Sequence, residues 1–178
     1  MSEYTATINE NEILSSAAYK ELLNKKSAVD FYRDNGASDH ILELVNMNAR
    51  SYGCFGEKFT RNHFRMDSPL NTEHDAILFD RTVEIKCPRL GKKGTFFIQH
   101  IKPYHKFEFI LINLLVFTGF KSYILTKRQA MPLLEEQRGE GYFIYQRDLE
   151  EHATVIENVV DLRNFIKNHR TKSWVLNE

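Results

Sequence analysis

Two carboxylates and a lysine close together in the sequence are the side chains best suited to chemistry. Asp75, Glu84 and Lys86 lie in the stretch 73–89, EHDAILFDRTVEIKCPR. Carboxylate oxygens are the ligands that Mg²⁺ prefers, and this ion usually keeps several of its waters. A lysine ammonium can orient or deprotonate a metal-bound water, or offset charge that builds up on a phosphate. These residues indicate metal-dependent phosphate chemistry if the fold brings them together.

A β-hairpin would bring them together. Residues 76–79 and 82–87 are rich in strand formers, and Asp80-Arg81 can supply a two-residue turn, although the favoured Asp-Gly or Asn-Gly pair is absent. The predicted register opposes three pairs: Phe79 with Thr82, Ile77 with Glu84, and Asp75 with Lys86.

The pleat of such a hairpin decides which side chains share a face. Side chains alternate along a strand and directly opposed residues project together, so Asp75, Glu84 and Lys86 would share one side. The other side would face the core through Val83, Ile85 and Cys87. Any half-buried strand shows the same alternation, so a purely structural hairpin is the alternative.

Asp75 followed by Glu84-Ile85-Lys86 resembles the signature of the PD-(D/E)xK nuclease superfamily, which includes type II restriction endonucleases, Holliday-junction resolvases and several repair nucleases. His74 stands where the name-giving proline would be. The resemblance implies a Mg²⁺ site formed by Asp75, Glu84 and the backbone carbonyl of Ile85, with Lys86 positioning the attacking water. It also implies cleavage of DNA that leaves 5′ phosphates.

Glu57 precedes the hairpin on a predicted helix, within the part of the chain (about 51–125) that the resemblance covers. In many nucleases of the resembled family a further glutamate from such a helix reaches the metal site, and Glu57 is the matching position. The alternative is a solvated glutamate paired with Arg61 four residues on. Gly53 and Gly56 would permit close approach of this helix to another backbone.

Positive charge accumulates after the hairpin, because no acidic residue occurs between Lys86 and Phe107. The candidate DNA-contacting residues are Arg89, Lys92, Lys93, Gln99, His100 and Lys102, together with Arg61. Lysines in the glycine-flanked loop 91–94 would bind phosphates through counterion release without reading bases. A basic surface loop without a ligand is the alternative. The choice of Gln99 comes from the resemblance, since some family members carry a glutamine at a similar distance.

The composition limits the class of protein. A length of 178 residues suits one domain, and 24 Lys and Arg balance 24 Asp and Glu, so any DNA binding must come from a local patch. The two cysteines show no metal-ligand spacing, which disfavours a structural zinc site or a disulfide framework and fits a reducing cytoplasm. The apolar run 107–117 is too short for a membrane span and contains Glu108, and we predict no signal peptide, so we expect a cytoplasmic protein with no membrane partner.

The predicted architecture is α/β: a single domain with a mixed central β-sheet flanked by helices, as in restriction endonucleases. Residues 1–36 form an N-terminal helical region, 37–126 the catalytic core, and 127–178 a C-terminal strand and helix. The expected elements are helices over 9–26 with an extension to 34, 38–67, 127–136 and 156–169, and strands over 107–116, 122–126 and 141–146, besides the hairpin. The strand over 107–116 is so apolar that we expect it at the centre of the sheet, and the strand over 141–146 at an edge.

We therefore expect a Mg²⁺-dependent endonuclease that cuts double-stranded DNA, resembling a compact type II restriction enzyme. One site cuts one strand and a palindromic duplex has a two-fold axis, so we expect a homodimer. The candidate interface is the N-terminal apolar stripe of Ile13, Leu14, Ala17, Leu22 and Leu23, which could equally cover the sheet. The alternatives are a structure-selective junction or repair nuclease of the same fold, and a non-catalytic DNA-binding module.

Overall fold

A five-stranded mixed sheet forms the centre of the computed structural model, which describes residues 27–137 and 141–169. Its strands are β1 (Ala76–Leu78), β2 (Arg81–Lys86), β4 (Phe109–Val116), β5 (Gly119–Thr126) and β8 (Thr154–Ile156), in the spatial order β1-β2-β4-β5-β8. Strands β2 and β4 are parallel, and the other neighbours are antiparallel. Strand β4 is central and buried almost throughout, as its apolar sequence predicts. The expected mixed central sheet is confirmed.

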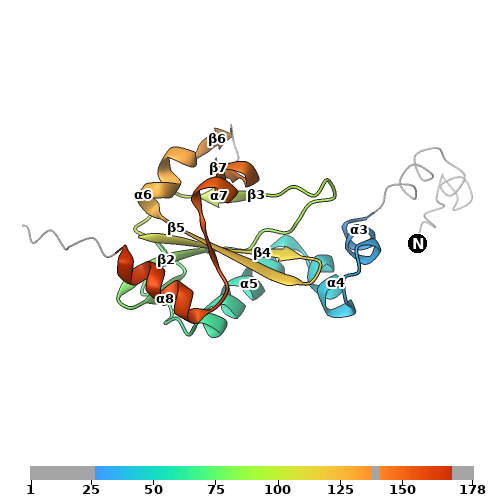
Figure 1. The fold of residues 1–178 in the computed structure, drawn as a ribbon, viewed down its shortest axis with the longest axis horizontal. Helices are drawn as coiled ribbons and strands as arrows, with labels where there is room; N and C mark the ends of the chain where they lie inside the picture. Colours follow the sequence, from blue (N-terminus) through green and yellow to red (C-terminus); the bar gives the residue numbers. More distant parts are fainter. Residues whose placement is uncertain (1–26, 138–140, 170–178) are drawn as a thin grey trace, which may run out of the picture.

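A smaller sheet of β3 (Phe97–Ile101), β7 (Gly141–Tyr145) and β6 (Glu135–Gln137), in the order β3-β7-β6, lies over one face of the central sheet. The short helices α6 (Lys127–Ala130), η1 (Met131–Leu133) and α7 (Gln146–His152) share this layer (Figure 1). Helices α5 (Ala49–Phe64) and α8 (Val159–Asn168) cover the opposite face. The helix expected over 127–136 is too long. Helix α6 ends at Ala130, and the 3₁₀ turn η1, which contains Pro132, ends at Leu133. The strand expected at an edge, β7, lies in the middle of the small sheet.

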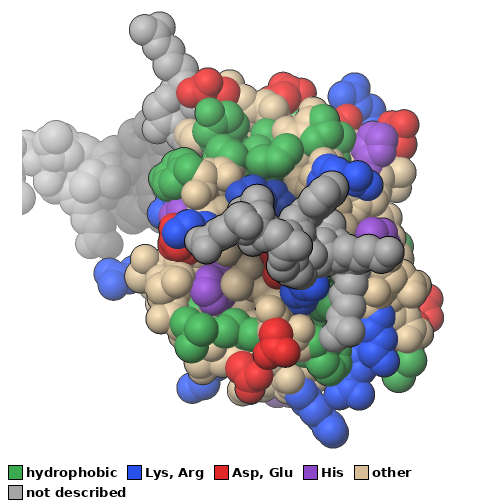
Figure 2. All heavy atoms as spheres, turned by 90° about the vertical axis from the view of Figure 1, so that its left-hand side faces the viewer, with side chains coloured by type: hydrophobic (Ala, Val, Ile, Leu, Met, Phe, Trp, Pro, Cys, Tyr) green, Lys and Arg blue, Asp and Glu red, His purple; other side chains and the backbone are tan. Residues whose placement is uncertain are grey.

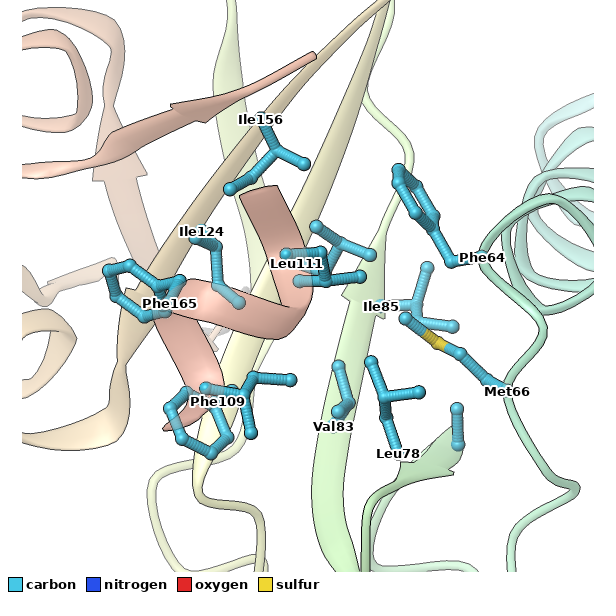
Figure 3. Close-up of a cluster of buried hydrophobic side chains, with 13 residues drawn as sticks. Phe64, Met66, Leu78, Val83, Ile85, Phe109, Leu111, Ile124, Ile156 and Phe165 are labelled. Atoms are coloured by element: carbon cyan, nitrogen blue, oxygen red, sulfur yellow. The ribbon is translucent and has the colours of Figure 1, made fainter. Parts of the chain in front are cut away.

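The two larger of the three parts of the hydrophobic core lie on opposite sides of the central sheet. Under the helices, Phe64 and Met66 lie beside Ile85 of β2, and Phe165 of α8 lies beside Phe109 of β4 (Figure 3). On the other side, apolar side chains of β4 and β5 meet Ile98 of β3 and residues of α6 and α7. This division leaves the end of β2 between two layers, with α5 on one side and β3 on the other.

The single helix predicted over 38–67 is wrong, because the chain forms two helices there. Helix α4 (Asp39–Asn46) ends before Met47, whose ψ of 144° is extended. Asn48 then caps α5, since its side-chain oxygen accepts a hydrogen bond of 2.9 Å from the Ser51 N–H. Asparagine competes with helix hydrogen bonds in this way and favours a cap over a helix interior. Further upstream, α3 (Ala28–Asp34) begins with a capping box at Ser27, and the helix predicted over 9–26 and its apolar stripe lie outside the described residues.

A buried chain of hydrogen bonds fastens α5 to the central sheet. The Thr60 hydroxyl donates to the Gly56 carbonyl (2.7 Å) and accepts from the Asn113 amide (2.5 Å). The Asn113 side-chain oxygen in turn accepts from the Ser122 hydroxyl of β5 (2.6 Å). Every polar group in this chain has a partner, so the network fixes the position of α5 over β4 and β5.

The two glycines of α5 give a matched test of this packing. A Cβ at Gly56 would lie 2.6 Å from the Cys87 sulfur, whereas a Cβ at Gly53 would have no neighbour within 4 Å. We expect Gly56→Ala to destabilise the protein by about 1–3 kcal/mol through overpacking. Gly53→Ala should instead stabilise it by about 0.5–1 kcal/mol, because alanine lowers the entropy cost of the helix. Urea unfolding of both variants measures the two free energies, and similar values would contradict the close helix–strand contact.

Candidate active site

The hairpin forms, but its turn lies one residue earlier than predicted. Phe79 and Asp80 are the turn residues, with φ of 52° and 62°, and β1 and β2 pair with Ala76 opposite Val83 and Leu78 opposite Arg81. Two positive φ values are the mark of the type I′ turn that suits a two-residue hairpin. The predicted Asp80-Arg81 turn is wrong by one residue, so the predicted pairing of the two strands is wrong by two residues. Because two is also the period of the pleat, the predicted faces survive the shift.

Asp75 lies beside Glu84 in the actual register, not beside Lys86. Its N–H donates to the Val83 carbonyl (3.0 Å), and its Oδ2 accepts from the Ile85 N–H (2.8 Å). The Asp75 carboxylate is thus held by the neighbouring strand. The Ile85 side chain points into the core below, as expected.

Glu84 and Lys86 form an ion pair on the face that carries Asp75. The distance from Lys86 Nζ to Glu84 Oε1 is 2.7 Å. The side chain of Lys86 is 21% exposed and that of Glu84 is 7% exposed. A pair this deeply placed has lost most of its hydration, so each charge depends on the other. Lys86 is consequently held close to the carboxylates rather than extended into solvent.

Glu57 of α5 is the predicted further member of the cluster. It is half-buried, and burial followed by the nearby Asp75 charge raises the pKa of its carboxyl group, with Glu84 adding to the rise and Lys86 and Arg61 opposing it. No ion pair joins Glu57 to Arg61 in the part of the chain that the structure describes. The lack of this ion pair disfavours the solvated Glu57–Arg61 pair, and membership of the cluster stays a prediction.

Arg61 positions Asp75. Its Nη1 donates to the Asp75 carbonyl at 3.0 Å, from the turn of α5 that follows Glu57. This bond ties the helix to the start of the hairpin at the point where the carboxylates meet. A DNA contact by the rest of the guanidinium stays a prediction.

Arg89 has a structural role in this fold, and its predicted phosphate contact stays a prediction. Its Nη2 donates to the Leu44 carbonyl (2.8 Å) and the Met47 carbonyl (2.9 Å), at the end of α4. The guanidinium also lies 3.9 Å over the Tyr52 ring. These contacts satisfy carbonyls that the end of a helix leaves without partners, so Arg89 holds α4 against the chain that follows β2.

The other predicted DNA contacts lie on the exposed connection after β2 and on β3. Lys92 and Lys93 are exposed in the loop, Gln99 and His100 are exposed on β3, and Lys102 is exposed just after it. A groove of about 410 Å³ runs between the first turn of α5 and β3. Lys86, Gln99 and His100 line it, whereas Lys102 does not.

The donor set suits a hard cation. Glu57, Asp75 and Glu84 supply carboxylates without a thiolate or imidazole among them, and Mg²⁺ is commonly bound through one or two carboxylates plus water. Among residues 27–137 and 141–169, however, no three His, Cys, Asp or Glu side chains are arranged so that they could hold a metal ion together. Asp75 and Glu84, with the Ile85 carbonyl, therefore stay the predicted ligands.

Charge at one end of the molecule is mixed (Figure 2). At the end of the molecule formed by α6 and α8, Lys and Arg side chains are scattered among acidic and hydrophobic ones (Figure 2). None of the described helices is long and apolar enough to cross a membrane.

Comparisons with known proteins add no relative. A scan against models of protein families gives no match for this chain, and a search of curated proteins finds none with significant similarity. The functional conclusion depends on the residues and their geometry.

Two residues important to the site were not predicted from the sequence. Asn113 anchors α5, and the signal was present, because it is the one polar residue in the apolar run FILINLLV. Phe97 lines the groove beside Lys86 and is 47% exposed. Its position two residues before Gln99 on one strand was the available sign.

The raised pKa of Glu57 predicts a pH-dependent stability difference. A carboxyl group whose folded pKa is raised stabilises the protein at low pH, and this contribution is lost as pH rises through the folded pKa. Glu57→Gln mimics the protonated form, so its melting temperature should exceed that of the parent at pH 7, and the gap should shrink toward pH 4. Thermal melts across this range measure the gap, with the exposed Glu43→Gln as control. An equal gap at all pH values would contradict the clustering of carboxylates.

Proposed function

We propose that this protein is a Mg²⁺-dependent endonuclease that cuts duplex DNA, as its resemblance to PD-(D/E)xK nucleases implies. The observation that carries the proposal is the meeting of Asp75, Glu84 and Lys86 on one face of a hairpin, with Glu57 approaching from α5. Burial, and after it the charges of Asp75 and Glu84, raise the pKa of the Glu57 carboxyl group, which supports a place for Glu57 near the hairpin carboxylates. Such a cluster suits a bound cation and a phosphate.

Each residue has a defined role in the proposed reaction. Asp75 and Glu84 would hold the metal, and Arg61 keeps Asp75 in place through its carbonyl. Bound Mg²⁺ supplies neutralisation of phosphate charge and a more acidic water. Lys86 would orient the attacking water and offset charge on the phosphate. Water adds to phosphorus, the bond from phosphorus to the 3′ oxygen breaks, and that oxygen takes a proton, which leaves a 5′ phosphate and a 3′ hydroxyl.

Sequencing the ends of cleaved plasmid DNA tests the proposal. Purified protein should cut plasmid with Mg²⁺ and stop when EDTA is added. Discrete bands with 5′ phosphates support a sequence-specific enzyme, and cleavage of a four-way junction alone would instead indicate a structure-selective nuclease. No cleavage of either DNA with Mg²⁺ or Mn²⁺ would contradict the proposal.

Metal binding has its own prediction, independent of cleavage. A ligand that binds only the folded state stabilises it by mass action, about 2.7 kcal/mol at one hundred times Kd. Mg²⁺ should therefore raise the melting temperature of the parent, whereas Asp75→Asn should show little shift. A parent without a shift, or an equal shift in both proteins, favours a non-catalytic DNA-binding module.

We also propose that the active form is a homodimer, because two sites related by a two-fold axis match a palindromic duplex. The proposed interface, residues 13–23, lies outside the described residues. Light scattering at micromolar protein measures the mass, and a monomer with full double-strand cleavage would overturn this proposal.

A further inference from the structure

The groove between α5 and β3 continues from the proposed catalytic cluster. Lys86 lies in its wall, so a phosphate beside Lys86 would place its neighbouring nucleotide at the mouth of the groove. A volume of about 410 Å³ falls in the range of small-molecule sites. A site of this size suits a ligand of small-molecule dimensions, such as one nucleotide, and not a whole duplex.

Phe97 provides an aromatic surface in this groove. Its side chain is 47% exposed, although the residue lies on a strand beside the buried Ile98. The ring of Phe143, itself 1% exposed, lies 5.7 Å away and supports Phe97 from the side of the small sheet. A half-exposed ring held in this way is suited to stack on a nucleobase, and such stacking tolerates any base.

Polar groups stand beside this ring. Gln99 and His100 line the groove, and neither side chain has a hydrogen-bond partner among the described residues. His100 has a φ of 56° at the irregularity between Ile98 and Ile101, where the register with β7 shifts. A non-glycine residue held in the left-handed region at a bulge is a strained feature that commonly redirects a side chain at a functional site.

The opposite wall, on α5, is made partly of small residues. Ala49 and Gly53 line the groove there, and a Cβ at Gly53 would meet nothing within 4 Å. Space is thus left open opposite the aromatic ring.

We propose that this groove binds one unpaired nucleotide next to the phosphate that is cut, with its base on Phe97 and its polar edge toward Gln99 and His100. The inference rests on the proposed nuclease function and names the form of its substrate: a nucleotide from a single strand, or one extruded from a duplex. The amide of Gln99 both donates and accepts hydrogen bonds, which matches the edge of a base. Extrusion costs unstacking energy that a preformed base pocket offsets.

Binding without metal tests the groove apart from catalysis. The probes are fluorescein-labelled single-stranded hexamers dA6 and dT6, measured by fluorescence anisotropy in EDTA. Phe97→Ala removes the stacking surface, and Gly53→Leu adds a side chain to the groove wall at a position where a Cβ would meet nothing within 4 Å. Both should weaken hexamer binding by about tenfold or more, as loss of one base stack does. Cys54→Leu, on the exposed side of the same helix, should bind as the parent does.

The outcomes separate this inference from the proposed function. Hexamer binding that is absent in the parent, or equal in the parent, Phe97→Ala and Gly53→Leu, overturns the groove assignment even if plasmid is cut. Cleavage by Glu84→Gln at the parent rate overturns the nuclease proposal. Hexamer binding still tests the groove in that case. A duplex carrying one 2-aminopurine distinguishes the two sources: a rise in its fluorescence that is lost in Gly53→Leu shows extrusion, and hexamer binding without this rise shows a single-stranded substrate.

Discussion

Glu84→Gln is expected to reduce cleavage of plasmid DNA by about 10²-fold or more, because it removes one of the proposed metal ligands. Glutamine keeps the size of the side chain and a carbonyl oxygen, so the hairpin should keep its shape. The Glu84 side chain is only 7% exposed and is paired with Lys86 at 2.7 Å. Initial rates of plasmid nicking at saturating Mg²⁺ measure the effect.

The control for this variant is a neighbouring carboxylate with a structural partner. Glu108 directly precedes β4 and forms an ion pair of 2.6 Å with Arg81 at the start of β2. Both residues lie outside the proposed cluster. Glu108→Gln should cut like the parent. Equal losses in Glu84→Gln and Glu108→Gln would mean that the effect reflects stability, and the assignment of Glu84 would fail.

Lys86→Met should also reduce cleavage by about 10²–10³-fold, because it removes the charge that faces the phosphate and the attacking water. Methionine matches the length of the lysine stem, so the packing of β2 is kept. Lys86→Met should also lower the free energy of unfolding, by about 1–3 kcal/mol, because it leaves Glu84 buried without a partner. Plasmid nicking and urea unfolding of one preparation report both quantities.

The double variant Glu84→Gln/Lys86→Met separates the two causes. With both charges removed, no unpaired ion remains, so its free energy of unfolding should return toward that of the parent. Cleavage should stay as low as in the single variants. A double variant that is as unstable as Lys86→Met, or one that cuts DNA, would contradict the pairing.

The faces of the hairpin were predictable from the sequence, and its register was not. Alternation has a period of two, so Asp75, Glu84 and Lys86 share a side in either register. The turn at Phe79-Asp80 requires two residues with positive φ, and a bulky aromatic residue is seldom found there. Local turn preferences therefore pointed to the wrong pair of residues, whereas the core-facing Val83 and Ile85 were assigned correctly.

The role of Arg89 was beyond sequence reasoning for a different reason. Its charge follows Lys86 in a basic stretch, which indicates a phosphate contact, but its partners are carbonyls of Leu44 and Met47, far away in the sequence. Every residue has a backbone carbonyl, so the sequence does not show which carbonyls lie at the end of a helix and need a partner. The break at Asn48 was hidden in a similar way, because asparagine occurs in helices as well as at their caps.

The cluster and the wall of the groove come from different sheets. Asp75, Glu84 and Lys86 belong to the hairpin of the five-stranded sheet, whereas Phe97, Gln99 and His100 belong to β3 of the small one. The hydrogen bonds that hold Asp75 involve only the hairpin and Arg61, and none of them passes through the 91–96 loop. Loops exposed in this way tolerate insertions and exchange of residues. Under the proposed nuclease function, target preference would diverge through β3 and the loop before it while the hairpin cluster stays constant, which makes this segment the part of the chain to randomise in a search for altered substrates.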